Sequence, residues 1–101
     1  MEYDKLVRDK IPKIIKGKGK IPKTHIASKK EYYKKLKEKL QEEVDEFLKA
    51  ETKEEFADVL EVLDAIGNFK KFTRKEILYI KNKKAEERGR FCEKVILEKV
   101  E

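Results

Sequence analysis

The chain has 101 residues, of which 48% are charged and 39% are hydrophobic, and it carries a net charge of +6. This length suits one domain, and the hydrophobic fraction is too high for a disordered tail. The sequence has no apolar run of transmembrane length and only one cysteine, Cys92, so a membrane-spanning protein and an internal disulfide are excluded. The single cysteine suits a reducing compartment, and the sequence has no signal-peptide pattern. We therefore expect a cytoplasmic protein. The basic charge favours a polyanionic partner such as a nucleotide, a nucleic acid or a membrane surface.

The two ends of the chain differ from its middle. Residues 1–23 are basic, and a short helix is expected within Leu6–Ile15 before a loop of lysines and glycines. Residues 23–27 alternate weakly between polar and apolar side chains, which is compatible with a short strand. Residues 91–100 are rich in apolar and β-branched side chains, which favours a terminal strand that could pair with residues 23–27.

Three helices are predicted between these ends by three capping boxes, in which a Ser or Thr and a Glu three residues later satisfy each other's backbone donors. The boxes begin at Ser28, Thr52 and Thr73. They place helices at about 29–49, 53–71 and 74–88, with short connections that favour antiparallel neighbours. We therefore predict a mainly all-α fold with three principal helices, in a single domain over residues 1–101.

Two acidic pairs lie in the first two of these helices, Glu43 with Glu46 and Glu55 with Asp58. The i, i+3 spacing places both carboxylates of a pair on one face of a helix. At about 100° per residue, Glu43 and Glu55 lie at or inside the edge of the apolar stripe of their helix, and their partners lie just outside it. The stripes consist of Tyr33, Leu36, Leu40, Val44 and Phe47 in the first helix and of Phe56, Val59, Val62, Leu63 and Ile66 in the second.

Four carboxylates near an apolar boundary require compensating positive charge, because burying an unpaired carboxylate is costly. A hard divalent cation, Mg²⁺ above all, would satisfy them together. The alternative is ordinary salt bridging to the many lysines of the chain. Glu61 and Asp64 form a rival i, i+3 pair, but they project from the far side of the second helix, where a solvated face is expected.

The third helix supplies the complementary charge. Its stripe is apolar at Ile77 and Ile80 and becomes cationic toward the C-terminus at Lys81, Lys84 and Arg88, which lie within about 40° of Ile77. Lysines that extend toward solvent, or the helix dipole, would explain this pattern equally well when it is taken alone. Beside a metal-binding cluster, however, cations of this kind hold a polyphosphate.

The runs Lys39–Glu46 and Glu54–Leu60 resemble the two signature segments of MazG-like nucleotide pyrophosphohydrolases, E-E-x-x-E followed after a variable gap by E-x-x-D. The flanking runs Lys5–Pro12 and Glu86–Phe91 resemble a subfamily of small prokaryotic members, so that the resemblance covers nearly the whole chain. It implies that the two acidic pairs are ligands of Mg²⁺. Only eight residues separate the two pairs, fewer than is usual in the wider family, which leaves open whether all four carboxylates reach one ion.

The resemblance also implies a fold and a reaction. Family members are built from helical hairpins that complete a bundle as homodimers or homotetramers, and they hydrolyse nucleoside triphosphates to the monophosphate and pyrophosphate. A metal-activated water would attack the α- or β-phosphorus. Glu42 is a candidate for orienting this water, although its helical phase points away from the stripe, and Arg8 and Lys10 are candidates for binding phosphate together with the cations of the third helix.

Base recognition and two other functions remain open at this point. Tyr32, Tyr33 and Phe47 could stack on a base, although core packing is the stronger expectation for Phe47. Within the same fold, the substrate could be phosphoribosyl-ATP, as in histidine biosynthesis. A small basic helical protein that binds nucleic acid is the third possibility, but no recognised nucleic-acid motif is present and that function leaves the boundary carboxylates unexplained. We therefore expect a nucleotide substrate and neither a membrane nor a nucleic-acid partner.

Overall fold

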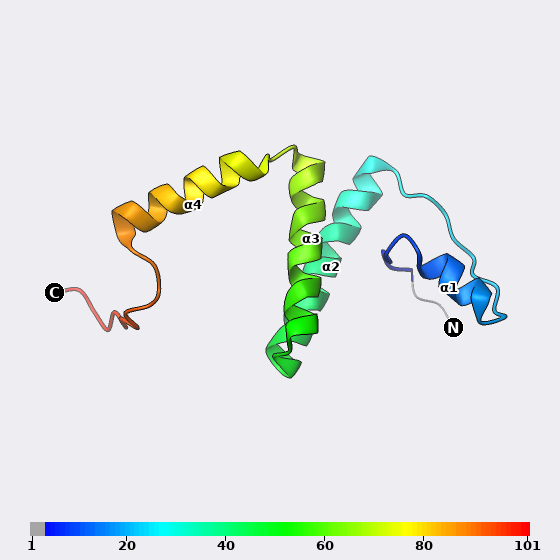
Figure 1. Cartoon of the computed structure of the whole chain (residues 1–101), viewed down its shortest axis with the longest axis horizontal. Helices are drawn as coiled ribbons and strands as arrows, with labels where there is room; N and C mark the ends of the chain where they lie inside the picture. Colours follow the sequence, from blue (N-terminus) through cyan, green and yellow to red (C-terminus); the bar gives the residue numbers. More distant parts are fainter. Residues whose placement is uncertain (1–3) are drawn as a thin grey trace. The chain divides into compact units, whose positions relative to one another are not determined.

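The computed structural model describes residues 4–101, which contain four helices and no strand. The helices are α1 (Ile11–Gly17), α2 (Lys29–Ala50), α3 (Lys53–Lys70) and α4 (Arg74–Arg88), as Figure 1 shows. The all-α prediction is confirmed, and the bounds of the three principal helices agree with those expected from the capping boxes to within one residue. No helix within the described residues combines the length and the hydropathy that crossing a bilayer requires.

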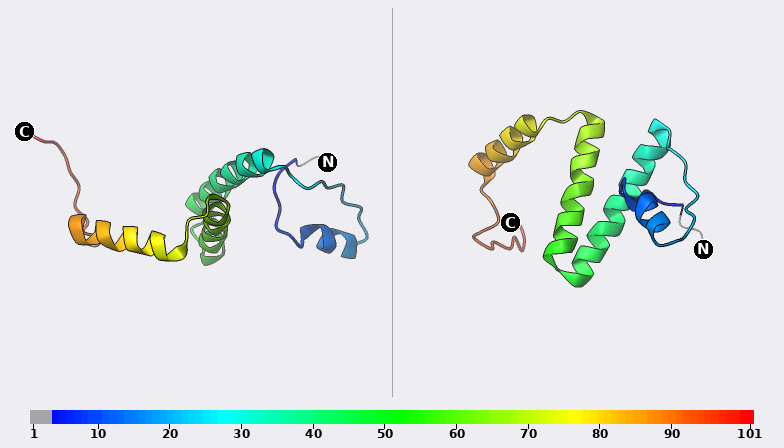
Figure 2. Two further views of the ribbon diagram at one scale, coloured as in Figure 1. Left: turned by 90° about the horizontal axis from the view of Figure 1, so that it is seen from above. Right: turned by 45° about the vertical axis from the view of Figure 1, so that its right-hand side comes forward.

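The chain divides into two compact units, one that ends at Lys70 and one that runs from Lys71 to Glu101. The first unit contains α1 and the hairpin of α2 and α3, seen from two further sides in Figure 2. The second unit contains α4 and the C-terminal segment.

A two-residue turn joins α2 to α3. Glu51 adopts the left-handed conformation with φ of 55°, and its backbone N–H donates to the carbonyl of Phe47 over 2.7 Å, which closes the end of α2. Thr52 then caps α3, because its hydroxyl accepts the backbone N–H of Glu55 over 3.2 Å. The tight turn brings the last turns of α2 beside the first turns of α3.

Aromatic contacts at both ends of the hairpin show that α2 and α3 are antiparallel. At the turn, Phe47 meets Phe56 edge to face, with ring centroids 5.7 Å apart. At the open end, Tyr33 stacks on Phe69 at 5.1 Å. These pairs add to the burial of apolar surface and hold the two helices in register along their whole length.

The core of the hairpin is small. Among the described residues, the buried apolar side chains are Leu36, 1% exposed, and Val62, 8% exposed. The apolar stripe predicted for α2 is buried or half-buried throughout. The stripe predicted for α3 is covered by α2 only in part: Phe56 contacts Phe47 but is still about half exposed, and so is Leu63. A second apolar face on α3 is therefore left uncovered within the chain.

The short N-terminal helix begins later than expected. α1 starts at Ile11 and ends at Gly17, because Pro12 occupies the first turn, where its missing N–H costs nothing and its fixed φ suits the helix. The preceding residues, from 4 to 10, form an irregular segment that lies against the hairpin through ion pairs described below.

The predicted pairing of residues 23–27 with residues 91–100 is wrong, since neither segment forms a strand. Residues 23–27 lead into α2, and His25 Nε2 lies 2.9 Å from the carboxylate of Glu31 in the first turn of that helix. Residues 91–100 are exposed throughout, with Phe91 at 99%. A strand gains stability from a ladder of hydrogen bonds and from side-chain packing, and apolar composition alone supplies neither.

The three capping boxes are formed to different degrees. The Thr73 box is complete, because Thr73 and Glu76 each accept the backbone N–H of the other. At Ser28 and Thr52 the hydroxyl accepts the expected N–H, but the carboxylates of Glu31 and Glu55 do not complete the box. Glu31 contacts His25, and Glu55 turns toward α2. The backbone of Glu55 thus caps α3 while its side chain is available for a site.

Candidate metal centre

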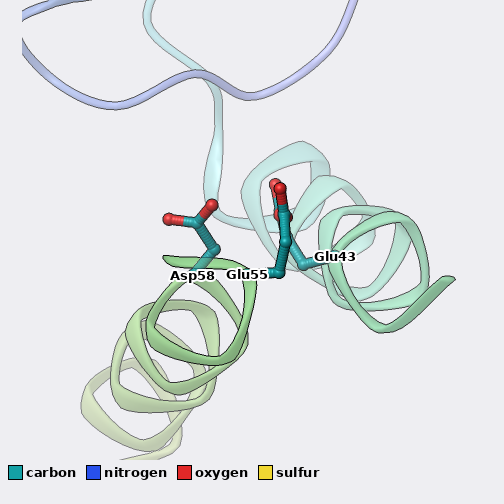
Figure 3. Close-up of side chains that lie close together, drawn as sticks. All are labelled: Glu43, Glu55 and Asp58. Atoms are coloured by element: carbon teal, nitrogen blue, oxygen red, sulfur yellow. The ribbon is translucent and has the colours of Figure 1, made fainter. Parts of the chain in front are cut away.

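Three of the four predicted carboxylates converge. One carboxylate oxygen each from Glu43 on α2 and from Glu55 and Asp58 on α3 lie within 4.8 Å of one another (Figure 3). Glu55 and Asp58 share one face of α3 through their i, i+3 spacing. The antiparallel hairpin then places that face opposite Glu43, and so the short gap between the two motifs is compatible with a shared site.

Two carboxylate oxygens of this cluster are buried without a hydrogen-bond donor. They are Oε2 of Glu43 and Oε2 of Glu55. Glu43 as a whole is only 7% exposed, although it lies on a helix of a small two-helix core. Burying a carboxylate oxygen that accepts no hydrogen bond costs free energy, which a cation among the three carboxylates would recover. Three carboxylates with free oxygens are the ligands that Mg²⁺ and Mn²⁺ prefer.

The electrostatics of Glu55 reflect the same crowding. Its pKa is raised from 4.5, first by desolvation and then by the negative charges of Glu46, Asp58 and Glu43. The group therefore holds a proton more tightly than an ordinary glutamate does when no metal is bound. A divalent cation at the cluster would reverse this effect, because it favours the ionised carboxylate.

Glu46 and Glu42 occupy the edge of the cluster. Glu46 is exposed and is not one of the three converging residues. Of the three negative charges that raise the pKa of Glu55, however, that of Glu46 has the largest effect. Glu42 is half-buried and forms ion pairs with Lys5 at 3.3 Å and with Lys39 at 3.6 Å. The structure thus brings three of the four predicted ligands together and places the fourth beside them.

Two cations contact the cluster directly. Arg8 Nη2 donates to Asp58 Oδ1 over 2.8 Å, and Lys39 Nζ lies 3.3 Å from Glu43 Oε1. The alternative of ordinary salt bridging is therefore correct in part. It accounts for one oxygen of Glu43 but not for its buried Oε2. Lys39 was missed as a site residue, although its i, i+4 spacing from Glu43 was available in the sequence.

A pocket of about 470 Å³ opens beside the carboxylates within the first unit. Its wall includes Glu43 and Asp58, and it also includes Arg8 and Lys10, both predicted to bind phosphate. The remaining lining combines the N-terminal segment and α1 with the hairpin: Leu6, Val7, Asp9, Ile11, Ile14, Tyr32, Leu36, Lys39, Glu61, Val62 and Ala65. The lining of the pocket thus combines carboxylates, cations and an apolar surface, which are the three features that a nucleotide-metal complex needs.

Of the aromatic residues considered for stacking on a base, Tyr32 lines this pocket. Its ring also meets Phe69 edge to face, with centroids 5.6 Å apart. Tyr33 stacks on Phe69 and does not line the pocket, and the ammonium groups of Lys37 and Lys70 each lie 4.7 Å from its ring centroid. Phe47 packs on Phe56, as expected for a core residue. Tyr32 is therefore the aromatic side chain best placed to meet a base.

Other predicted residues lie away from the three carboxylates or in the second unit. Glu61 lines the pocket wall but does not join the cluster, and Asp64 is exposed on α3. Lys81, Lys84 and Arg88 are exposed on α4, in the second unit, so their approach to the carboxylates stays a prediction.

The raised pKa of Glu55 predicts how binding of a divalent cation depends on pH. Protons compete with the cation for this carboxylate at pH values above 4.5, where an ordinary glutamate is already mostly ionised. We expect the affinity for Mn²⁺, measured by isothermal titration calorimetry, to rise with pH above this value and to level off once Glu55 is ionised. Glu55→Gln should flatten this rise, whereas an unchanged pH profile in the variant would assign the titration to another group.

In the absence of metal, the raised pKa of Glu55 makes the stability of the fold fall as pH rises, which is opposite to its effect on metal affinity. A raised pKa means that the folded state binds the proton more tightly than the unfolded state, so Glu55 favours folding at low pH. That contribution is lost as pH rises through the raised pKa. Metal affinity and metal-free stability should therefore respond to pH in opposite directions at this residue.

Comparison with known proteins found no family model, no curated protein and no solved structure that matches this chain. The function is therefore inferred from the geometry of the carboxylates and the pocket, together with the resemblance of the two motifs.

Proposed function

We propose that this protein is a Mg²⁺-dependent nucleotide pyrophosphohydrolase that converts a nucleoside triphosphate to the monophosphate and pyrophosphate. The observation that carries the proposal is the convergence of Glu43, Glu55 and Asp58 within 4.8 Å, with two buried oxygens that lack a donor, beside a pocket whose lining includes Arg8 and Lys10. The resemblance to MazG-like enzymes supports the same assignment, because it implies from the sequence motifs that these residues are ligands.

We assign the hairpin residues to two roles, holding the metal ion and placing a cation beside the substrate pocket. Glu43, Glu55 and Asp58 would hold Mg²⁺, with Glu46 beside them to complete the ligand set. When bound, the ion would activate a water molecule and neutralise charge on the phosphates. Glu42 holds Lys39 next to Glu43, which keeps an ammonium group at the pocket wall.

The pocket wall supplies cations for the phosphates. Arg8 and Lys10 extend from the N-terminal segment into the lining of the pocket. A guanidinium and an ammonium there would bind phosphate oxygens and offset the charge that develops on the leaving pyrophosphate. Lys81, Lys84 and Arg88 remain proposed contributors from the second unit.

The first test is pyrophosphate release from a panel of canonical and modified nucleoside triphosphates, with Mg²⁺ and with EDTA. Release from at least one member that EDTA abolishes would establish the reaction class and begin to rank substrates. No pyrophosphate release from any member of the panel would contradict a triphosphate substrate. Phosphoribosyl-ATP would then be the next compound to assay.

Binding to nucleic acid is the second candidate, and one observation favours it. The second unit is basic and exposed along α4, which offers a surface for phosphates. A steep loss of DNA or RNA affinity with increasing salt would support it. It does not explain the buried carboxylates of the hairpin, and EDTA-sensitive pyrophosphate release would argue against it as the main function.

We further propose that two or more copies of the chain complete the helical bundle. The hairpin has a small core, and α3 presents Phe56, Leu60 and Leu63, each about half exposed, at i, i+4 and i+7 on one face. A second copy of the hairpin that packs this face against its own would bury all of them, and it would give the four-helix arrangement that the resemblance implies.

A charge on this face tests the assembly. We expect Leu60→Glu to convert a dimer or tetramer to the monomer in size-exclusion chromatography with light scattering, because an unpaired carboxylate would be buried in the contact. Leu97→Glu, in the exposed C-terminal segment, is the matched control and should leave the mass unchanged. A wild-type chain that is monomeric at high micromolar concentration would contradict the proposal.

A further inference from the structure

Three contacts hold the N-terminal segment across the carboxylate side of the hairpin, toward which the oxygens of the cluster point in Figure 3. Lys5 pairs with Glu42 at 3.3 Å and Arg8 pairs with Asp58 at 2.8 Å. Lys35 Nζ of α2 donates to the backbone carbonyl of Asp4 over 2.7 Å. Each contact joins residues at least 31 positions apart in the sequence, so these contacts depend on the folded hairpin.

The Arg8 contact is directed at a carboxylate of the candidate metal centre. Arg8 Nη2 binds Oδ1 of Asp58, and one oxygen of Asp58 belongs to the three that converge within 4.8 Å. A divalent cation held by that group would repel a guanidinium at hydrogen-bond distance from one of its ligands, since charges of the same sign would lie within a few ångströms. Coordination of a divalent cation by Asp58 therefore competes with the ion pair between Asp58 and Arg8.

Arg8 is more exposed than Lys39, the other cation that contacts the cluster. Arg8 belongs to the irregular segment, and more than half of its side chain is exposed. Lys39 is fixed on α2 one turn before Glu43, and its side chain is only 19% exposed. A metal ion would therefore displace Arg8 before Lys39. Arg8 lines the pocket, so its displaced guanidinium would still face the pocket.

We propose that Arg8 is an exchangeable counter-ion: it neutralises Asp58 in the metal-free protein, a divalent cation displaces it, and the released guanidinium then binds a phosphate group of the substrate in the pocket. This inference rests on the proposed function, because it assumes the metal centre and the nucleotide pocket. It adds an order to their assembly, in which metal binding prepares the residue that recognises the phosphate. A planar guanidinium suits this role, because it pairs with carboxylate and phosphate in the same two-pronged geometry.

The exchange predicts effects of opposite sign for one substitution. Without Arg8, the cation no longer competes with an ion pair for Asp58, so Arg8→Gln should bind Mn²⁺ about two- to fivefold more tightly than the wild type, the range expected for losing a solvent-accessible ion pair. The same variant should bind the magnesium complex of inorganic triphosphate about tenfold more weakly, because a charged donor to the phosphates is missing. A residue that only stabilises the site would weaken both.

Both affinities are measured by isothermal titration calorimetry on the full chain, first with Mn²⁺ alone and then with magnesium triphosphate at saturating Mg²⁺. Lys13→Gln is the matched control, since it removes the same charge from exposed α1 at a position that does not line the pocket. It should leave both affinities within about twofold of the wild type. Thermal unfolding of each variant establishes that the proteins compared are folded.

The outcomes separate this inference from the function on which it rests. Tighter Mn²⁺ binding with weaker triphosphate binding in Arg8→Gln supports the exchange. Mn²⁺ binding that is equal or weaker in Arg8→Gln overturns it while leaving the metal centre in place, and unchanged triphosphate binding overturns the second step. No binding of Mn²⁺ to any of the three proteins would reject the metal centre itself, and with it the proposed function.

Discussion

Glu43→Gln is expected to lower Mg²⁺-dependent pyrophosphate release by at least ~100-fold, because residues that only support metal ligands already cost about 10- to 100-fold when replaced. The substitution keeps the shape of the side chain and removes the charge at the one cluster residue that is buried. It also replaces an oxygen of Glu43, either the one that contacts Lys39 or the buried one that lacks a donor, with an NH₂ group that cannot coordinate a metal. Asp58→Asn should behave in the same way. Affinity for Mn²⁺ should fall together with activity.

The substitution is informative because the fold should tolerate it. Lys39, the partner of Glu43, also lies 3.6 Å from Glu42, so its ammonium keeps a counter-ion when Glu43 is neutral. A buried neutral amide is also less costly than a buried carboxylate with a free oxygen. We therefore expect the melting temperature of Glu43→Gln, measured without metal, to equal or exceed that of the wild type.

Asp64→Asn is the matched control, since it neutralises an exposed carboxylate of the rival pair on α3, outside the cluster. It should retain activity within about twofold, as a surface substitution remote from the site. Full activity in both Glu43→Gln and Asp58→Asn would show that the cluster is only a network of salt bridges. Loss of activity in Asp64→Asn instead would move the metal centre to the rival pair.

Local rules explain how much of the fold could be predicted. A helix start is specified within four residues, so Ser28, Thr52 and Thr73 were sufficient to place three helices. Helical phase is similarly local, and it correctly placed Glu43 on the inner face of α2. The same logic could not exclude a strand at residues 91–100, because strand formation depends on a partner that the segment does not find within its unit.

The site was predictable where it depends on spacing within a helix and unpredictable where it depends on the approach of distant segments. The i, i+3 pairs indicated Glu55 and Asp58 as neighbours. No pattern indicated that Arg8 contacts Asp58, because 50 residues separate them and only the folded segment brings them together. The exposure of Glu46 agrees with its helical phase, which places it just outside the apolar stripe, but its absence from the three converging carboxylates depends on how the two helices pack.

Leu36→Ala is expected to destabilise the protein by about 2–4 kcal/mol, the range for removing a buried leucine side chain and leaving a partly collapsed cavity. Leu36 is 1% exposed and is the largest fully buried side chain among the described residues. Within residues 4–101, Val62 is the one other buried apolar residue, so the hairpin has little other core to compensate. Since small domains are stable by about 5–15 kcal/mol, this single loss is a large fraction of the total.

Urea denaturation followed by circular dichroism measures the effect, with Leu48→Ala as the matched control. Leu48 lies on the same helix and is mostly exposed, so the same truncation should change the free energy of unfolding by about 0.5 kcal/mol or less. Leu36 also lines the pocket beside Glu43 and Asp58, so any folded fraction of the variant should bind Mn²⁺ more weakly as the carboxylates lose their support. Equal stabilities of the two variants would contradict a core centred on Leu36 and would place the main apolar contacts elsewhere, with the exposed face of α3 as the first region to examine.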